Sequence, residues 1–336
     1  MIRGKNGRPY LIAEIGGNHE GNFETAKYLC NLAINTDVDS VKFQLYRGDS
    51  LVNKKLSPDR NRHFKKFELT IDEHIYLAEM VKESGKNYST SIWDLDFLPK
   101  FDKYLDYYKI GSGDLTNRYY LSKFLKNEKP IIISTGLSTF AEIEDCINFI
   151  RHQNEFYKEL GTLFILQCTS MYPILNSEAN LNVIKKIASI DNIVVGYSDH
   201  TIGIDALVTS FAVGAELLEF HFTDIKEGKE FRDHLVSLTP SDIKNLCDNL
   251  DDVTILLGTG DKVPLLTEIS SGHVDSFRRA VYLNKKLNAG SVIKEEDLVV
   301  LRPNNGISAI SYFDVVGKQL LIDFEELEPL RWDLFK

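Results

Sequence analysis

Charged side chains recur near the ends of short apolar segments along this chain of 336 residues. Lys42 and Gln44 lie two residues apart in one such segment, and Lys109 lies in another. Glu219 and His221 are also two apart, and alternate residues of a strand point to the same side. Buried lysine and glutamate need partners, so packing alone does not account for these positions.

Two lysines among hydroxyl side chains suit the binding of a phosphate, because point charges and hydroxyl donors together can surround an oxyanion. Lys42 and Lys109 would supply the charges, while Ser112 and Ser134 would supply hydroxyl groups. A structural salt bridge is the alternative for either lysine alone. Their joint placement on one rim favours the anion site.

Two histidines belong to neighbouring predicted strands, His200 at the end of the seventh and His221 within the eighth. Imidazole nitrogens commonly bind divalent metals, and Glu14 and Glu219 are expected to face the same mouth. A metal site and a pair of structural histidines are both open interpretations of this spacing.

Two other polar segments are weaker candidates for a functional site. The consecutive residues Ser198-Asp199-His200 are not read as a catalytic triad, because a triad is defined by spatial geometry. Asp233 and His234 follow the charged run 226–230. Taken alone, that pattern favours a solvated loop.

Short apolar or β-branched runs alternate with longer segments of helical periodicity. The strands are expected at Tyr10–Ile15, Ser40–Leu45, Tyr88–Ile92, Tyr107–Gly111, Pro130–Ser134, Thr162–Gln167, Ile193–Gly196 and Glu216–Phe222. The helices are expected around Phe23–Asn35, Ile71–Ser84, Leu121–Asn127, Thr139–Arg151, Leu181–Ser189, Ile204–Val213 and Ser241–Leu250. Start signals include Ser138 and the pair Thr239-Pro240.

Eight strands in about 250 residues predict an α/β fold, a closed (β/α)₈ TIM barrel with its working residues at the C-terminal ends of the strands. An open doubly wound sheet is the competitor. No G-x-G-x-x-G follows the first strand, which weakens its dinucleotide-binding version.

The sequence pattern changes after Leu257. The segment from Gly258 to Pro264 is typical of a linker, and short apolar pairs then alternate with turn signals. We predict a barrel domain at 1–258, a linker at 259–277 and a small C-terminal domain of short strands at 278–336. That tail contains no cysteine to staple it, so we expect it to dock against the barrel or a partner chain.

The composition limits the class of protein. With 43% hydrophobic and 26% charged residues, the chain is neither disordered nor a low-complexity scaffold. A net charge of −10 argues against nucleic-acid binding, so any anion must be held by a few local basic groups. The four cysteines are far apart, and neither a signal peptide nor an apolar run of membrane-spanning length is present. We therefore expect a cytoplasmic protein that does not enter a membrane.

In this order the motifs resemble the sialic acid synthase (N-acetylneuraminate synthase) family, and the resemblance covers nearly the whole chain. The barrel motifs are Ala13-Glu14-Ile15-Gly16-Gly17-Asn18-His19-Glu20-Gly21, Val41-Lys42-Phe43-Gln44, Lys109-Ile110-Gly111-Ser112-Gly113-Asp114, Ile133-Ser134-Thr135-Gly136-Leu137-Ser138, Gln167-Cys168-Thr169-Ser170-Met171-Tyr172-Pro173, Gly196-Tyr197-Ser198-Asp199-His200-Thr201-Ile202-Gly203 and Glu219-Phe220-His221-Phe222-Thr223. The tail, from Arg278-Arg279-Ala280 to Arg302-Pro303-Asn304-Asn305-Gly306-Ile307, resembles the antifreeze-like (SAF) domain of that family.

The resemblance implies a reaction in which phosphoenolpyruvate condenses with an N-acylated hexosamine, such as N-acetylmannosamine, to form a nonulosonic acid. Water adds to the intermediate, and phosphate leaves by C–O cleavage. The runner-up within enzymes is a related phosphoenolpyruvate-condensing synthase acting on a simple phosphorylated sugar. A non-catalytic sugar- or ice-binding protein is the alternative from another class.

The resemblance also implies roles for individual residues. His200 and His221 would hold a divalent metal, usually Mn²⁺, with Mg²⁺ or Co²⁺ as alternatives. The ligands of phosphoenolpyruvate would be Lys42, Lys109, Ser112, Ser134 and Ser198. The ligands of the amino sugar would be Glu14, Gln44, Tyr172 and Asp233. Arg302 would contact the N-acyl group in the partner subunit's barrel, which implies a homodimer with exchanged C-terminal domains.

Two questions stay open at this point. Glu219, with Glu14 and His221 among the candidate catalytic residues, either transfers a proton or supports the metal histidines. The chain departs from the family's usual motifs at Gly17, Glu20, Leu137 and Phe220. No residue decides among N-acetylmannosamine, its 6-phosphate, and the 2,4-diacetamido sugars that lead to legionaminic or pseudaminic acid.

Overall fold

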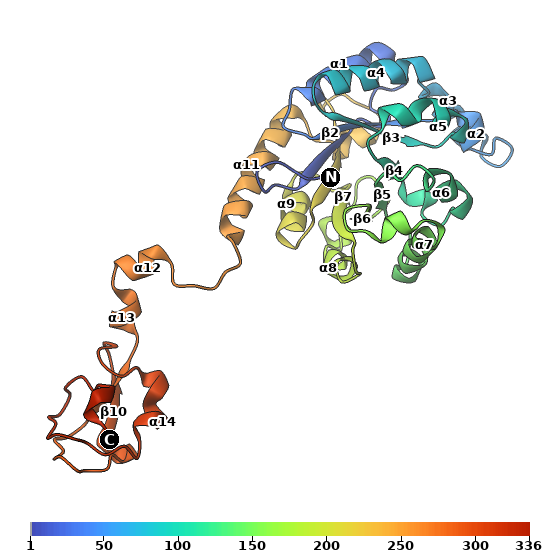
Figure 1. Ribbon diagram of the computed structural model, residues 1–336. Coiled ribbons are helices and arrows are strands. Elements are labelled where there is room, and N and C mark those ends of the chain that lie inside the picture. The colour runs from blue at the N-terminus through green and yellow to red at the C-terminus, as the bar shows by residue number, and fades with distance from the viewer. Residues whose placement is uncertain (1) are drawn as a thin grey trace. The chain divides into compact units, whose positions relative to one another are not determined.

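The computed structural model describes residues 2–336, and the chain forms two compact units. The first unit ends at Gly258 and the second runs from Thr259 to Lys336 (Figure 1). The first unit contains all eight parallel strands, and the second contains one short antiparallel pair.

The eight strands of the first unit confirm the predicted barrel. They are β1 (Tyr10–Glu14), β2 (Ser40–Leu45), β3 (Asn87–Ile92), β4 (Tyr108–Ile110), β5 (Ile131–Ser134), β6 (Leu163–Cys168), β7 (Val194–Asp199) and β8 (Leu217–His221). β1 pairs with both β2 and β8, which brings the first and last strands together. β3 and β4 lie side by side and complete the ring, although no ladder joins them within residues 2–336.

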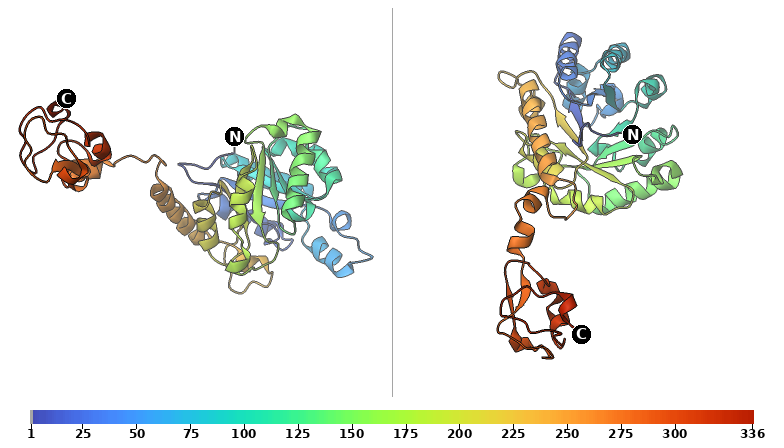
Figure 2. Two further views of the ribbon diagram at one scale, coloured as in Figure 1. Left: turned by 90° about the horizontal axis from the view of Figure 1, so that it is seen from below. Right: turned by 60° about the vertical axis from the view of Figure 1, so that its left-hand side comes forward.

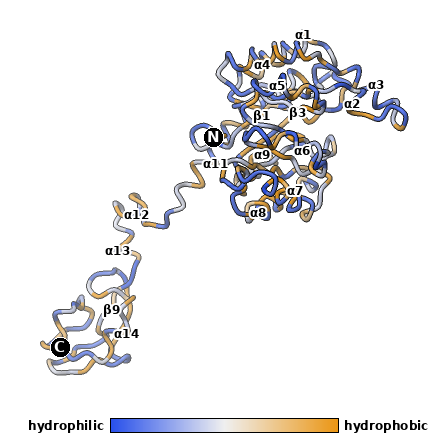
Figure 3. Tube along the Cα trace, turned by 45° about the vertical axis from the view of Figure 1, so that its right-hand side comes forward, coloured by the Kyte–Doolittle hydropathy of each residue, from blue (hydrophilic) through white to orange (hydrophobic). Residues whose placement is uncertain are grey.

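Helices surround this ring of strands (Figure 2, right). The crossover helices between successive strands are α1 (Phe23–Ile34), α4 (Ile71–Glu83), α5 (Leu98–Phe101), α6 (Arg118–Phe124), α7 (Phe140–Gln153), α8 (Asn182–Ala188) and α9 (Asp205–Ala212), and α11 (Pro240–Leu257) follows the last strand. Each longer helix buries one apolar stripe and exposes polar residues, so hydrophobic and hydrophilic colours alternate along the helical turns in Figure 3.

Capping residues fix where several helices begin. Thr70, Thr139 and Thr239 each accept a hydrogen bond from the third helical residue, whose carboxylate bonds back to the cap. The sequence-based start at Ser138 is therefore one residue early. The predicted start at Thr239-Pro240 matches α11, which continues seven residues past its predicted end at Leu250.

Alternation along the strands divides the interior of the barrel into layers. An apolar cluster that includes Tyr10, Tyr107 and Phe164 fills the end of the barrel where the strands begin. Towards the C-terminal ends, the same faces carry polar residues, as in the progression Tyr10, Ile12, Glu14 along β1. Gly196 leaves room within this packing, because a Cβ there would lie 2.4 Å from a Leu166 methyl group.

Two helices between β2 and α4 were not predicted from the sequence. α2 (Gly48–Leu51) and α3 (Pro58–Lys66) occupy the long connection, and a third short helix, α10 (Asp233–Val236), follows β8. Among the residues of α3, Asn61 alone is buried, so the segment lacks the apolar periodicity by which a helix is recognised.

The second unit begins with two short helices, α12 (Leu266–Ser270) and α13 (His273–Phe277). Its strands β9 (Ala280–Leu283) and β10 (Leu298–Leu301) pair antiparallel, and α14 (Tyr312–Val315) follows. A separate apolar core forms beneath them, made of Val281, Leu283, Ile293, Leu298, Ile307, Val315, Leu320, Phe324, Leu330 and Leu334. Nowhere in residues 2–336 is a helix long and apolar enough to cross a bilayer.

Candidate active site

A cavity of about 700 Å³ opens at the C-terminal ends of the barrel strands. It brings together all the candidate site residues of the first unit. These are Glu14, Lys42, Gln44, Lys109, Ser112, Ser134, Tyr172, Ser198, His200, Glu219, His221 and Asp233. The remaining candidate, Arg302, follows β10 in the second unit.

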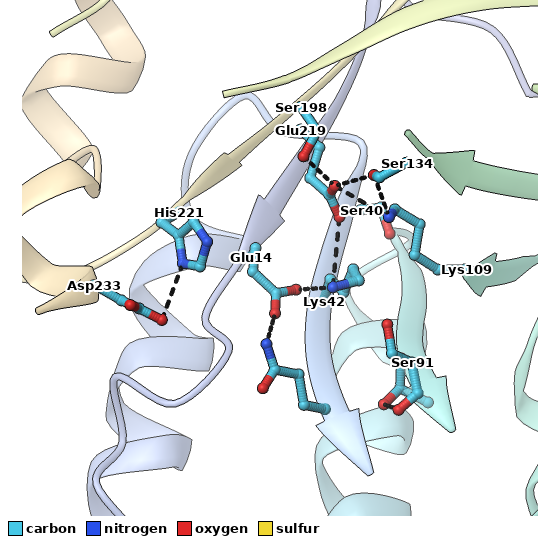
Figure 4. Close-up of polar contacts among 12 residues, drawn as sticks. Glu14, Ser40, Lys42, Ser91, Lys109, Ser134, Ser198, Glu219, His221 and Asp233 are labelled. Carbon is cyan, nitrogen blue, oxygen red and sulfur yellow. Dashed lines mark hydrogen bonds and ion pairs between the residues drawn. The ribbon is translucent and has the colours of Figure 1, made fainter. Parts of the chain in front are cut away.

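A buried chain of ion pairs crosses the floor of this cavity (Figure 4). Lys42 of β2 pairs with Glu14 of β1, and its Nζ lies 3.4 Å from Oε1 of Glu219 on β8. Oε2 of Glu219 lies 3.3 Å from the Lys109 Nζ on β4. Each of these four side chains is at most 7% exposed, so solvent screens their interactions weakly.

Two of the three hydroxyl groups expected to bind phosphate, those of Ser134 and Ser198, belong to the same network, whereas the Ser112 hydroxyl accepts a hydrogen bond of 3.0 Å from the Gly136 amide. Ser198 donates a hydrogen bond of 2.8 Å to Glu219, and Lys109 donates one of 2.7 Å to Ser134. The Ser134 Oγ lies 3.5 Å from the same Glu219 carboxylate. The two lysines and these two hydroxyl groups of the predicted anion site thus converge on one carboxylate of the chain.

The two carboxylates of the network have opposite pKa shifts. Burial raises the pKa of the Glu14 carboxyl, against the attraction of Lys42. Burial would also raise the pKa of Glu219, but Lys109, Lys42 and the Ser198 hydroxyl together hold it well below its usual range. Glu219 is therefore ionised at neutral pH, while Glu14 accepts a proton more readily.

The histidine pair lies beside this network. The His200 and His221 ring centroids are 5.4 Å apart, and Nδ1 of His200 lies 2.7 Å from the Thr169 carbonyl oxygen. That contact assigns the Nδ1 proton of His200 and leaves its Nε2 as a potential ligand atom. Burial lowers the pKa of His221 to about 4, so this imidazole is neutral at neutral pH.

The donor set fits a divalent metal. The Nδ1 of His221 is buried and makes no hydrogen bond to any described residue, as expected of a nitrogen awaiting a ligand. No three His, Cys, Asp or Glu side chains in residues 2–336 are grouped as a complete metal centre. A metal on the two imidazoles would therefore keep open positions for water and substrate.

The other side of the cavity carries two of the four residues assigned to the sugar, Tyr172 and Asp233, whereas Gln44 donates a hydrogen bond of 2.8 Å to Glu14 on the floor. Asp233 accepts a hydrogen bond of 2.9 Å from Nε of Arg232, whose guanidinium lies 4.4 Å from the Tyr172 ring centroid. The expectation of a solvated loop is wrong at Asp233 and His234, which are 5% and 1% exposed. They are buried because α10 turns back towards His221, 3.9 Å from the Asp233 carboxylate.

Sequence reasoning missed a wall of the cavity formed largely by α3. Arg60, His63, Phe64 and Phe67 line it, together with Phe231 from the loop after β8. The Phe67 and Phe231 rings pack with centroids 4.8 Å apart. The available signal was Ser57-Pro58-Asp59, a pattern typical of a helix start.

The fold and the cavity define a TIM-barrel protein with a buried polar site at the C-terminal ends of its strands. The chain belongs to the NeuB family, whose profile matches residues 29–262. The SAF domain profile matches residues 278–336, the segment predicted to form the antifreeze-like domain. The resemblance inferred from the motifs is thereby confirmed.

Named relatives agree with this membership over almost the full chain. N,N′-diacetyllegionaminic acid synthase of Legionella pneumophila is 32% identical over 98% of this chain and 96% of its own length. Human N-acetylneuraminate-9-phosphate synthase is 28% identical over 97% of this chain and 92% of its own. The crystal structure of N-acetylneuraminic acid synthetase from Leptospira borgpetersenii has the same fold, with 24% identity and a TM-score of 0.73 over 79% of this chain and 90% of its own. The protein is an enzyme of the nonulosonic acid synthase family.

Proposed function

We propose that the protein condenses phosphoenolpyruvate with an N-acetylated hexosamine, such as N-acetylmannosamine, and releases phosphate. The observation that supports this proposal is the cluster of lysine and hydroxyl side chains on the cavity floor. Two buried lysines, Lys42 from β2 and Lys109 from β4, reach Glu219, and Ser134 and Ser198 join them. Such a cluster suits a small ligand with more than one negative charge.

In this proposal the phosphate and carboxylate of phosphoenolpyruvate bind Lys42, Lys109, Ser112, Ser134 and Ser198. C3 of phosphoenolpyruvate forms a bond to the aldehyde carbon of the open-chain sugar. Water then adds at C2, and the C–O bond to phosphate breaks, so the phosphate leaves with the bridging oxygen. A divalent metal on His200 and His221, Mn²⁺ with Mg²⁺ or Co²⁺ as alternatives, would act as a Lewis acid on the aldehyde oxygen.

Two carboxylates with opposite pKa shifts suit opposite proton-transfer roles. We assign the ionised Glu219 to accept the proton of the attacking water, and Glu14, whose pKa is raised, to donate a proton to the developing alkoxide. Lys42 contacts both groups, and its position between them lets it stabilise negative charge on either.

The proposal is less specific about the sugar than about phosphoenolpyruvate. The relative at 32% identity is named for N,N′-diacetyllegionaminic acid, which supports a 2,4-diacetamido sugar as the alternative. Pseudaminic acid precursors belong to the same alternative. On the protein side, Gln44, Tyr172, Asp233 and the wall of the cavity at α3 are the groups available to discriminate among them.

A substrate panel tests the proposal directly. With Mn²⁺ present, we expect phosphate release from phosphoenolpyruvate only when a suitable amino sugar is added, with the new sugar acid detected by mass spectrometry. The panel contains N-acetylmannosamine, its 6-phosphate and 2,4-diacetamido hexoses. Tight binding of one sugar without turnover of any would favour a sugar-binding protein instead.

Metal binding has its own readout. Changing His200 to alanine removes one of the two proposed imidazole ligands, so we expect Mn²⁺ affinity to fall by more than the about 10- to 100-fold that loss of a hydrogen-bond partner of a ligand costs. The signal of free Mn²⁺ in electron paramagnetic resonance measures this affinity without any substrate. His152, on the exposed end of α7, provides the matched control as His152→Ala. Equal Mn²⁺ affinity in all three proteins would refute the metal assignment.

We also propose the assembly implied by Arg302, a homodimer in which each C-terminal domain serves the partner's barrel, in the cytoplasm. Hydrogen bonds within the second unit fix the backbone next to Arg302. Tyr282 donates a hydrogen bond of 2.7 Å to the Pro303 carbonyl, and the Asn304 amide donates one of 2.8 Å to the Asp275 carbonyl. These bonds hold the turn that carries Arg302.

A further inference from the structure

The turn after β1 fastens the loop that follows β8. The Asn18 side chain, 1% exposed, donates one hydrogen bond of 2.8 Å to the Phe222 carbonyl and another of 2.8 Å to the Ser237 hydroxyl. Phe222 is the first residue of that loop and Ser237 follows α10. One buried amide therefore joins both ends of the excursion that contains Arg232 and Asp233.

The Ser237 hydroxyl passes this constraint to Asp233. Ser237 is fully buried, and its Oγ donates a hydrogen bond of 2.7 Å to the Asp233 carbonyl while accepting the bond from Asn18. A hydroxyl has one hydrogen to donate and two lone pairs, so both bonds can form together. The backbone of Asp233 is thus tied to the turn after β1 through the side chains of Ser237 and Asn18.

A steric contact secures the same loop on its outer side. A Cβ at Gly17 would lie 3.1 Å from two carbons of the Phe231 ring and 3.3 Å from the Phe67 ring. The missing side chain lets Phe231 pack on this turn, next to Phe67. Polar and apolar contacts therefore fasten the loop immediately before and after Arg232 and Asp233.

We propose that Asn18 and Ser237 are positioning residues for the sugar side of the cavity. They orient Arg232 and Asp233 and leave the anion side, which is built on β2, β4, β5 and β7, unaffected. This inference rests on the proposed function, because it assigns the β8–α10 loop to the sugar. Small displacements of a substrate-binding group are costly, since productive geometry tolerates shifts of well under about 1 Å.

The test is the variant Ser237→Ala, which deletes one oxygen. We expect KM for the amino sugar that the wild-type protein turns over fastest to rise about tenfold, with KM for phosphoenolpyruvate within about twofold of wild type. KM does not depend on how much of the protein is folded, so a partly unstable variant is still informative. Amide hydrogen exchange should also accelerate in the peptide covering residues 231–237.

Ser210→Ala is the matched control, because Ser210 is also fully buried and its Oγ donates to a backbone carbonyl, that of Leu207 in α9. Its two KM values should match wild type. Unchanged KM values in Ser237→Ala, or an equal rise in both, would overturn the inference. If Asp233→Ala raises the sugar KM while Ser237→Ala does not, the positioning role of Ser237 is refuted but the assignment of Asp233 to the sugar stands. Absence of turnover by the wild-type protein would instead refute the proposed function.

Discussion

Replacing Glu219 with glutamine is expected to lower kcat about a thousandfold, within the range of a lost proton-transfer group, while tightening the binding of inorganic phosphate. The free protein balances the charges of Lys42 and Lys109 with those of Glu14 and Glu219. Glutamine keeps the shape of the side chain but removes one negative charge. The two lysines then face one carboxylate, which leaves positive charge for an incoming anion.

The gain in phosphate affinity separates this role from a structural one. Charges a few ångströms apart in a partly desolvated site interact by a few kcal/mol, so we expect phosphate to bind about tenfold more tightly, measured by calorimetry. Glu216→Gln is the control, because Glu216 directly precedes β8 and its side chain is exposed. Weaker phosphate binding by a folded Glu219→Gln protein would show that Glu219 organises the lysines and does not compete with the anion.

The second large effect concerns the proposed exchange of domains. Arg302→Ala is expected to lower kcat/KM about 100-fold with an intact fold, because a charged hydrogen bond to the substrate would be lost. His221→Ala should be inactive for a different reason, the loss of a metal ligand. If each site combines the barrel of one chain with Arg302 of the other, a mixed dimer contains one complete site.

Random mixing of equal amounts makes about half of the dimers mixed, so recovery should reach about a quarter of wild-type activity. The measurement is phosphate release after unfolding and refolding the two variants together, with differently tagged chains to count mixed dimers. Arg331→Ala, which removes an exposed arginine paired with Asp333 in the same unit, should stay active alone. No recovery in a sample that contains mixed dimers would rule out a shared site.

The strands were the most predictable part of the fold. All eight appear within two or three residues of the expected bounds, because parallel strands buried on both faces read as continuous apolar runs. Helix α3 was missed for the opposite reason, since Pro58–Lys66 is polar and one of its residues is buried. Its place beside the cavity depends on tertiary contacts such as those of Phe67 with Phe231.

The candidate site was predictable as a set of residues but not as a set of contacts. Alternation placed Lys42, Lys109 and Glu219 on inward faces, and closure of the barrel then gathered them. The sequence offered no indication that Glu219 would meet both lysines, because the three residues lie on strands far apart in the chain. The position of the Asp233 backbone was likewise unpredictable, because it depends on the contact of Ser237 with Asn18, which lies more than 200 residues away in the sequence.

The aromatic layer at the start of the strands determines from which end of the barrel ligands can reach the cavity. Tyr10, Tyr107 and Phe164 close the interior below the lysines, so the cavity is a blind well with its mouth at the strand ends. Two ligands that bind in such a cavity must enter and leave through the same opening. In the proposed reaction, a phosphate on Lys109 and Ser134 would bind to strand residues, whereas a sugar at Tyr172 and Asp233 would bind to the loops beyond the strand ends, so we expect phosphoenolpyruvate to enter before the sugar.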